Sequence, residues 1–171
     1  MGVTGLLILL QMLLIDVWPV TSVPFCDQTF LDHYIRSIIK EDKEMNVSCQ
    51  FSRNVTVPQP SLNAEWRALQ TSRQEAEIRH GFTLLLNSVP EVTTFISQCK
   101  LNVPLQRFSS NIRTMGNILQ QVNKKIDPHP LEDARTLTVT TLQQFYTVYK
   151  NFLVGKYKTL VRSLCTGLGY R

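Results

Sequence analysis

Apolar residues recur every three or four positions through four long segments of the chain, which is the spacing of one buried face on an α-helix. The segments cover about residues 27–45, 63–99, 105–126 and 138–164. No segment of the chain alternates convincingly with a two-residue period between turn residues, although short β-pairing remains open around Val55 and Val57. The pattern therefore predicts an all-α fold with four long helices.

Two positions inside these segments are unfavourable for a regular helix. The apolar stripe of the second segment keeps its register across Pro90, so we expect one long helix with a kink at that proline. Gly155 is the weak point of the fourth segment, since a glycine inside a helix costs roughly 1 kcal/mol relative to alanine. Close approach by the backbone of a partner is one reason to keep a glycine there.

A short apolar run precedes the first helical segment. Residues 6–15 are apolar apart from Gln11, and Val20 and Ser22 then suit a cleavage site. The run has roughly half of the ~20 residues that cross a bilayer, and a core helix would need a polar face that this run lacks. We therefore expect residues 1–22 to be a secretory signal peptide and residues 23–171 to form one secreted, extracellular domain with no membrane insertion.

The lengths of the connections narrow the topology. About 17 residues link the first two helical segments and about 12 link the last two, whereas only a few link the middle pair. At about 3.3 Å per residue, either long connection can run the length of a helix, so each can join two parallel helices. The middle helices must be antiparallel neighbours. An oligomeric coiled coil is the alternative, but the charge pattern of a zipper is absent.

All four cysteines lie in the expected mature part, and an even number in a secreted chain points to two disulfides with three possible connectivities. Cys49 follows the first helix and Cys99 ends the second, so they lie at the same end only if these helices run parallel. Cys26 and Cys165 then meet at the other end. Pairing Cys26 with Cys165 and Cys49 with Cys99 predicts an up-up-down-down four-helix bundle with two long crossover loops.

Composition and motifs favour a binding protein over several other classes. The net charge of +5 contains no run of five like charges, which argues against a nucleic-acid-binding arm. His33, His80 and His129 have no metal-ligand spacing, so neither a metal site nor a cofactor is expected. Common catalytic motifs are absent, and Glu75 and Glu77 face different sides of a helix. We expect no enzyme. A secreted carrier is the alternative, but the Phe, Leu and Ile of the stripes predict a filled core.

Two glycosylation sequons lie in the connection between the first two helices. They are Asn46-Val47-Ser48 and Asn54-Val55-Thr56. Two sequons in one expected surface loop of a secreted chain predict N-glycans on Asn46 and Asn54.

The run Val-Tyr-Lys-Asn-Phe-Leu-Val-Gly-Lys at residues 148–156 resembles the last-helix signature of the erythropoietin and thrombopoietin family of class I helical cytokines. Cys26-Asp27, the run at residues 54–58, Trp66 and Arg113 also fall where this family has them. The last-helix run is closer to the erythropoietin branch. Because a Cys49–Cys99 bridge looks more like the second disulfide of the thrombopoietin branch, a thrombopoietin-like cytokine remains the alternative.

The resemblance implies a long-chain, monomeric helical cytokine that brings together a homodimeric, single-pass class I receptor, activates JAK-STAT signalling and promotes red-cell production. It also implies two receptor-binding faces. The stronger, called here the strong face, comprises Leu62, Asn63, Asn151, Val154, Gly155 and Lys156. The weaker, called here the weak face, comprises Phe30, His33, Tyr34, Ser110, Arg113, Thr114 and Ile118. The helical pattern puts Lys156 on a solvent-facing side, and Arg113 among small residues suits an interface anchor.

Overall fold

The computed structural model describes residues 26, 28–44, 48–101, 105–122 and 134–167. The helices are α2 (Gln28–Glu44), α3 (Ala64–Ala68), α4 (Thr71–Gln98), α5 (Gln106–Val122), α6 (Leu142–Phe152) and α7 (Lys158–Gly167), with a π-helical turn η1 (Leu153–Tyr157) and strands β1 (Gln50–Pro58) and β2 (Thr136–Thr141). The expected signal peptide, the Asn46 sequon and His129 lie outside the described residues.

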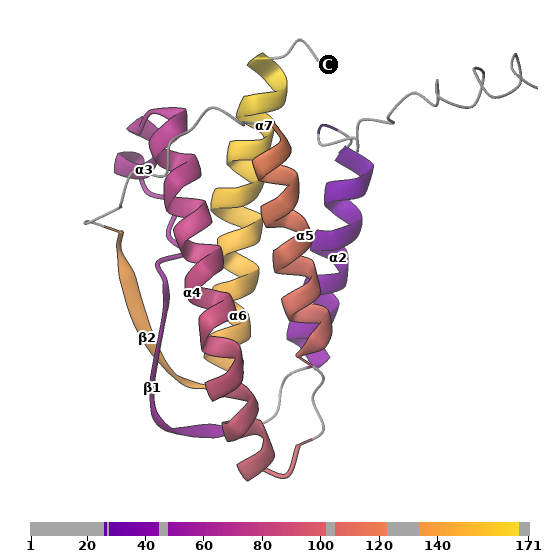
Figure 1. The fold of residues 1–171 in the computed structure, drawn as a ribbon, viewed down its shortest axis with the longest axis vertical. Coiled ribbons are helices and arrows are strands. Elements are labelled where there is room, and N and C mark those ends of the chain that lie inside the picture. Colours follow the sequence, from indigo (N-terminus) through magenta and orange to yellow (C-terminus); the bar gives the residue numbers. More distant parts are fainter. Residues whose placement is uncertain (1–25, 27, 45–47, 102–104, 123–133, 168–171) are drawn as a thin grey trace, which may run out of the picture.

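Four rods build the bundle: α2, α4, α5 and the continuous rod formed by α6, η1 and α7 (Figure 1). The rods α2 and α4 run in one direction, and α5 and the last rod run in the other. At the end of α4, Lys100 has a φ of 57° and the Leu101 N–H donates to the Ile96 carbonyl at 3.1 Å. This left-handed turn ends the helix ahead of the reversal into α5. The predicted up-up-down-down topology is confirmed.

Both predicted disulfides are present, at opposite ends of the bundle. Cys26 precedes α2 and pairs with Cys165 of α7, with their Cα atoms 5.5 Å apart. Cys49 precedes β1 and pairs with Cys99 at the end of α4, with Cα atoms 5.8 Å apart. The Cys49–Cys99 bridge follows from the parallel arrangement of α2 and α4, and the Cys26–Cys165 bridge follows from the antiparallel arrangement of α2 and α7.

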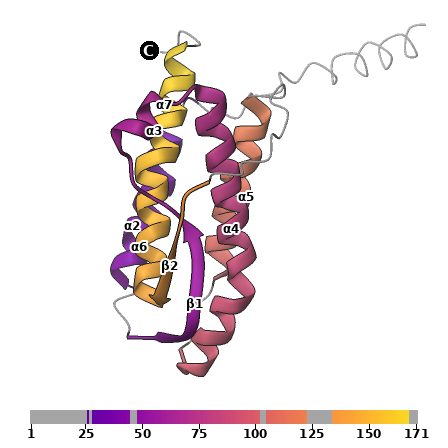
Figure 2. The ribbon, with the colours of Figure 1, turned by 90° about the vertical axis from the view of Figure 1, so that its left-hand side faces the viewer.

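The long connections are not plain loops, because they pair as a small antiparallel sheet. Val55 pairs with Val139 and Val57 pairs with Leu137. The β1–β2 sheet lies across α4 and α6 (Figure 2). Val55 and Val57 are buried while Thr56 between them is exposed, which is the two-residue period of a half-buried strand. The pairing that the sequence left open around these valines is confirmed.

The sheet also corrects the predicted start of the last helix. Residues 138–141 belong to β2, and α6 begins only at Leu142. The Thr141 hydroxyl caps α6 by accepting a hydrogen bond from the Gln144 N–H at 3.2 Å. Threonines favour strands and helix caps over helix interiors, which explains why the helix cannot start earlier.

The second predicted helix is likewise divided. Residues Leu69 and Gln70 have extended backbone, with ψ near 148° and 147°, and they separate the short α3 from α4. Because of this break, Trp66 of α3 is buried in the core, and the apolar side chains of α4 are buried along a separate helix face. Pro90 lies inside α4, as predicted.

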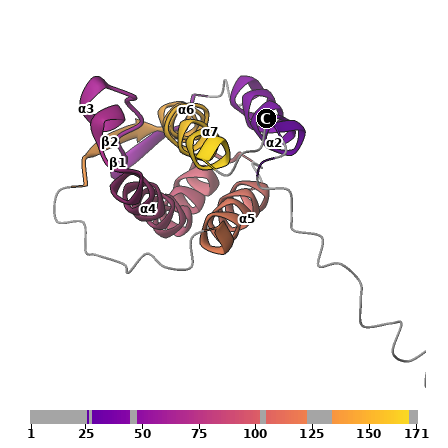
Figure 3. The same cartoon turned by 90° about the horizontal axis from the view of Figure 1, so that it is seen from above.

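Aromatic rings fill the core between α4, α5 and α6. The Phe108 ring lies 4.4 Å from that of Tyr149 and 5.2 Å from that of Phe145, centre to centre. The view from above places these helices around the shared core (Figure 3). Within the described ranges, no helix is long and apolar enough to cross a membrane.

Candidate binding faces

Strong-face residues from two distant segments meet at η1. A Cβ added at Gly155 would lie 3.6 Å from the Pro60 carbonyl oxygen and 3.8 Å from the Leu62 Cβ. The segment before α3 therefore packs directly over this turn of the last rod. The chain's own crossover is thus in ordinary contact with Gly155, which stays half-buried.

An exposed apolar spot lies beside this contact. Val154 is 40% exposed, and among the described residues it is the large hydrophobic side chain that the fold leaves uncovered. Asn151, one turn earlier on the same rod, is also exposed. An exposed apolar side chain next to polar groups is a common feature of a protein-binding surface.

Lys156 is not on the solvent-facing side, so that prediction is wrong. Its residue surface is only 2% exposed, its ammonium donates to the Glu77 carboxylate, and its nitrogen lies 5.8 Å from the ring centre of Trp66. Lys156 comes four residues after the buried Phe152, in register with the apolar stripe, and that spacing was the sequence signal for burial. A buried ammonium needs such a paired carboxylate, because an unpaired charge there is strongly unfavourable.

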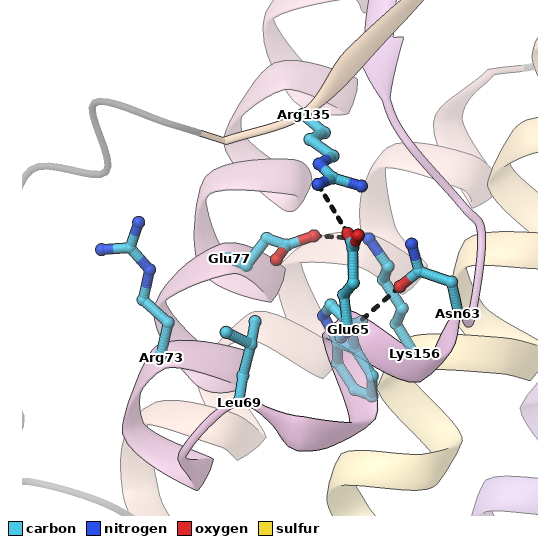
Figure 4. Close-up of a pocket in the computed structure, with 8 residues that line it drawn as sticks. Asn63, Glu65, Leu69, Arg73, Glu77, Arg135 and Lys156 are labelled. Atoms are coloured by element: carbon cyan, nitrogen blue, oxygen red, sulfur yellow. Dashed lines mark hydrogen bonds and ion pairs between the residues drawn. The ribbon is translucent and has the colours of Figure 1, made fainter.

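A pocket of about 200 Å³ with mostly polar and charged lining residues opens beside this ion pair, where α3, α4, η1 and the residue before β2 meet (Figure 4). The Arg135 guanidinium pairs with Glu65 across it at 2.6 Å. The Asn63 side chain accepts a hydrogen bond from the Trp66 N–H at 2.9 Å, so Asn63 is both exposed and the N-cap of α3. Of the two ion pairs at the pocket, one joins the residue before β2 to α3 and the other joins η1 to α4.

The weak-face residues lie on α2 and α5, which are neighbours in the bundle (Figure 3). His33, Ser110 and Arg113 are exposed, and Tyr34 and Thr114 are half-buried. Ile118 is only 7% exposed and therefore offers little surface to a partner. Phe30 lies in α2, but its side chain is outside the described part of the structure.

An ion pair links α2 to α7, the two helices whose segments the Cys26–Cys165 disulfide also joins. The Lys158 ammonium donates to the Asp32 carboxylate at 2.8 Å. This hydrogen bond holds the pKa of Asp32 below its usual value. Because both side chains are partly solvated, the pair contributes orientation more than stability.

A buried carboxylate also lies on α4, at a position that we did not predict to be buried. Glu75 is fully buried and accepts from Arg79 Nε at 2.9 Å, while Arg79 Nη2 donates to the Leu119 carbonyl of α5 at 3.0 Å. Glu75 precedes Ile78 by three residues and is therefore in register with the buried stripe of α4. As predicted, Glu75 and Glu77 face different neighbours and form no carboxylate pair.

The comparison with known proteins agrees with this geometry. The sequence profile of the erythropoietin/thrombopoietin family matches residues 23–167. The chain belongs to this family. It is 28% identical to erythropoietin of Mus musculus over 180 residues, which cover 94% of this chain and 93% of that protein. The match to erythropoietin of Sus scrofa is 28% identical over 181 residues and covers 93% of each. The match to erythropoietin of Felis catus is 27% identical and covers 94% of each.

Membership in the erythropoietin/thrombopoietin family agrees with the helical bundle and makes the chain a hormone of the cytokine class. The family is one of cytokine hormones and not of enzymes, and its ligands act on cytokine receptors. Among the described residues, no group of three or more His, Cys, Asp or Glu side chains is arranged to hold a metal ion.

Proposed function

We propose that this erythropoietin-family cytokine brings together two copies of one single-pass class I receptor of the erythropoietin-receptor type, activates JAK-STAT signalling and promotes red-cell production. The observation that carries the proposal is the separation of the two faces on the bundle. Asn151 and Val154 are exposed on the last rod, whereas Ser110 and Arg113 are exposed on α5. One ligand with two separate faces has the geometry needed to hold two receptor chains.

The chemistry of the faces fits a protein partner. Val154 offers an apolar contact, and the Arg113 guanidinium beside Ser110 offers a planar donor for a carboxylate or carbonyl. The net charge of +5 favours attraction to an acidic receptor surface, which mainly raises the association rate.

Secretion and glycosylation belong to the same proposal. Two disulfides are typical of proteins that fold in an oxidising compartment. The Asn54 side chain is exposed on β1, which suits an N-glycan that leaves both faces open. Residues 1–22 are proposed as the cleaved signal peptide, and Asn46 as a second glycan site.

A growth assay tests the hormone function. Cells whose survival depends on the erythropoietin receptor should grow with the purified chain, and a chain carrying Arg113→Glu should bind these cells without supporting growth. No growth at saturating wild-type protein would contradict the proposal.

Cells that depend on the thrombopoietin receptor should run in parallel, because the Cys49–Cys99 bridge favours a thrombopoietin-like ligand as the second candidate. Growth of only those cells would select that candidate.

A further inference from the structure

Two carboxylates near the start of α4, the fully buried Glu75 and the partly buried Glu77, pair with different neighbours. Glu77 pairs with Lys156 of η1, and Glu75 pairs with Arg79, which bonds to α5. The helix α4 carries none of the residues expected on the strong face or the weak face. It nevertheless contacts elements that carry both faces, including η1 and α5.

On one side, the Glu77 pair fastens the two halves of the strong face together. Lys156 lies between the carboxylate and the Trp66 ring, and the Gln74 amide of α4 donates to the Trp66 carbonyl at 3.0 Å. Trp66 belongs to α3, which directly follows Leu62 and Asn63. The crossover half of the strong face is thus attached to the η1 half through a charged group that is itself buried.

On the other side, Arg79 fixes the position of α5. Buried apolar side chains of α5, such as Phe108 and Ile112, supply most of its packing, and apolar contacts have little directional preference. The hydrogen bond from Arg79 to the Leu119 carbonyl is directional and acts near the end of α5. A shift of one residue along a helix moves every side chain by about 1.5 Å and turns it by about 100°. The bond therefore restrains the register of α5, the helix that carries Arg113.

We propose that α4 sets the geometry of the two receptor faces separately, Glu77 positioning the strong face through Lys156 and Glu75 positioning the weak face through Arg79. The inference rests on the proposed two-receptor function. Glu75, Glu77 and Arg79 act here as positioning residues, since none of them needs to touch the receptor.

Titration calorimetry with the soluble receptor ectodomain separates the faces, because the first binding event reports the strong face and the second reports the weak face. Glu77→Ala should raise the dissociation constant of the first binding event tenfold or more. The dissociation constant of the second event should change by less than about twofold, which corresponds to less than about 0.4 kcal/mol of binding free energy. Arg79→Ala should do the reverse. Each variant is the matched control for the other.

Conservative variants distinguish positioning from a general loss of structure. Glu77→Gln keeps an acceptor for Lys156 and should recover part of the lost strong-face affinity. Arg79→Lys keeps the cation beside Glu75 but loses the planar fork that also reaches Leu119, so it should recover little weak-face affinity. All variants are compared at a temperature where their circular dichroism spectra match that of the wild type.

The outcomes are distinct. Equal weakening of both events by each alanine variant, or no change in either event, overturns the inference. A wild-type chain that binds only one receptor, or none, contradicts the proposed function as well. If the wild-type chain shows two binding events but each alanine variant weakens both events equally, only the positioning roles are contradicted.

Discussion

The contact between α4 and α6 and the contact between η1 and the first crossover involve the same rod, but they are built differently. At the first, a Cβ on Gly81 would overlap the Phe152 ring, whose Cε2 lies within 3.0 Å of that position. At the second, a Cβ on Gly155 would be in ordinary contact with Pro60 and Leu62. The first contact is apolar and has no space for an added methyl group, whereas the second accepts one in ordinary contact and lies beside the Lys156–Glu77 ion pair.

The difference separates stability from recognition. Close-packed apolar groups account for most of the stability of a domain, and removing even one buried methylene group lowers the free energy of unfolding. Directional polar bonds define where a surface segment lies, often with little net gain in stability. We therefore expect changes at the α4–α6 contact to affect unfolding, and changes near η1 to affect mainly binding.

The largest expected effect follows from emptying the α4–α6 contact. Phe152 is fully buried and its ring meets that of Phe82 edge-on at 6.0 Å. Phe152→Ala should lower the free energy of unfolding by about 3–5 kcal/mol because it leaves a cavity that the helices cannot close. Urea unfolding followed by circular dichroism measures this value. A loss below about 1 kcal/mol would show that the contact is not closely packed.

Alkaline pH should weaken the same rod. Burial raises the pKa values of Tyr146, Tyr149 and Tyr157 above their usual value of 10.0. Above that pH the unfolded chain releases these protons while the folded chain retains them, so stability falls as pH rises. Each tyrosine contributes at most about 1.4 kcal/mol per pH unit, and this full slope is reached only where the unfolded tyrosine is ionised.

Unfolding free energies measured from about pH 8 to about pH 11 check this slope, with Tyr149→Phe as the control that should make it shallower. Tyrosinate absorbance that rises near pH 10 in the folded chain, with unchanged stability, would contradict the burial of these hydroxyls.

A smaller loss is expected when the α4–α6 contact is overfilled. Gly81→Ala forces the Phe152 ring to move, at a cost of about 1–3 kcal/mol. Gly116→Ala is the matched control, because a Cβ there would lie 3.7 Å from the Phe82 ring and needs no movement. Equal melting temperatures for the two variants would remove the steric argument.

The patterns in the sequence predicted the apolar α4–α6 contact better than the surroundings of η1. Phe82, Phe145 and Phe152 follow the apolar stripes, so their burial and the four rods could be derived from spacing alone. The cysteine positions were sufficient for the topology, because only parallel first and second helices bring Cys49 to Cys99.

The surroundings of η1 and the paired crossovers were harder to predict, because their structure depends on contacts between segments far apart in the sequence. Lys156 is buried only because Glu77 and Trp66 arrive from other segments, and no local propensity encodes that meeting. The strands likewise form only because two distant crossovers pair. The register of Lys156 and Glu75 within the apolar stripes was the available signal. It was missed because Lys156 was assigned to the solvent-facing side and Glu75 was considered only as a member of a possible carboxylate pair.

The smallest effect is expected at Gly155. Gly155→Ala should change the free energy of unfolding by less than about 1 kcal/mol, since the added methyl group has room and alanine favours helical backbone. Differential scanning calorimetry detects the change. A large destabilisation would mean that the crossover lies closer to η1 than described, and the contrast with Gly81 would disappear.

The mass of the complex with the soluble receptor ectodomain tests the two-face account most directly. Light scattering coupled to size exclusion should give two receptors per wild-type chain, and one receptor per chain carrying Arg113→Glu, because only the weak face is removed. A single receptor on the wild-type chain, or two on the Arg113 variant, would contradict the account.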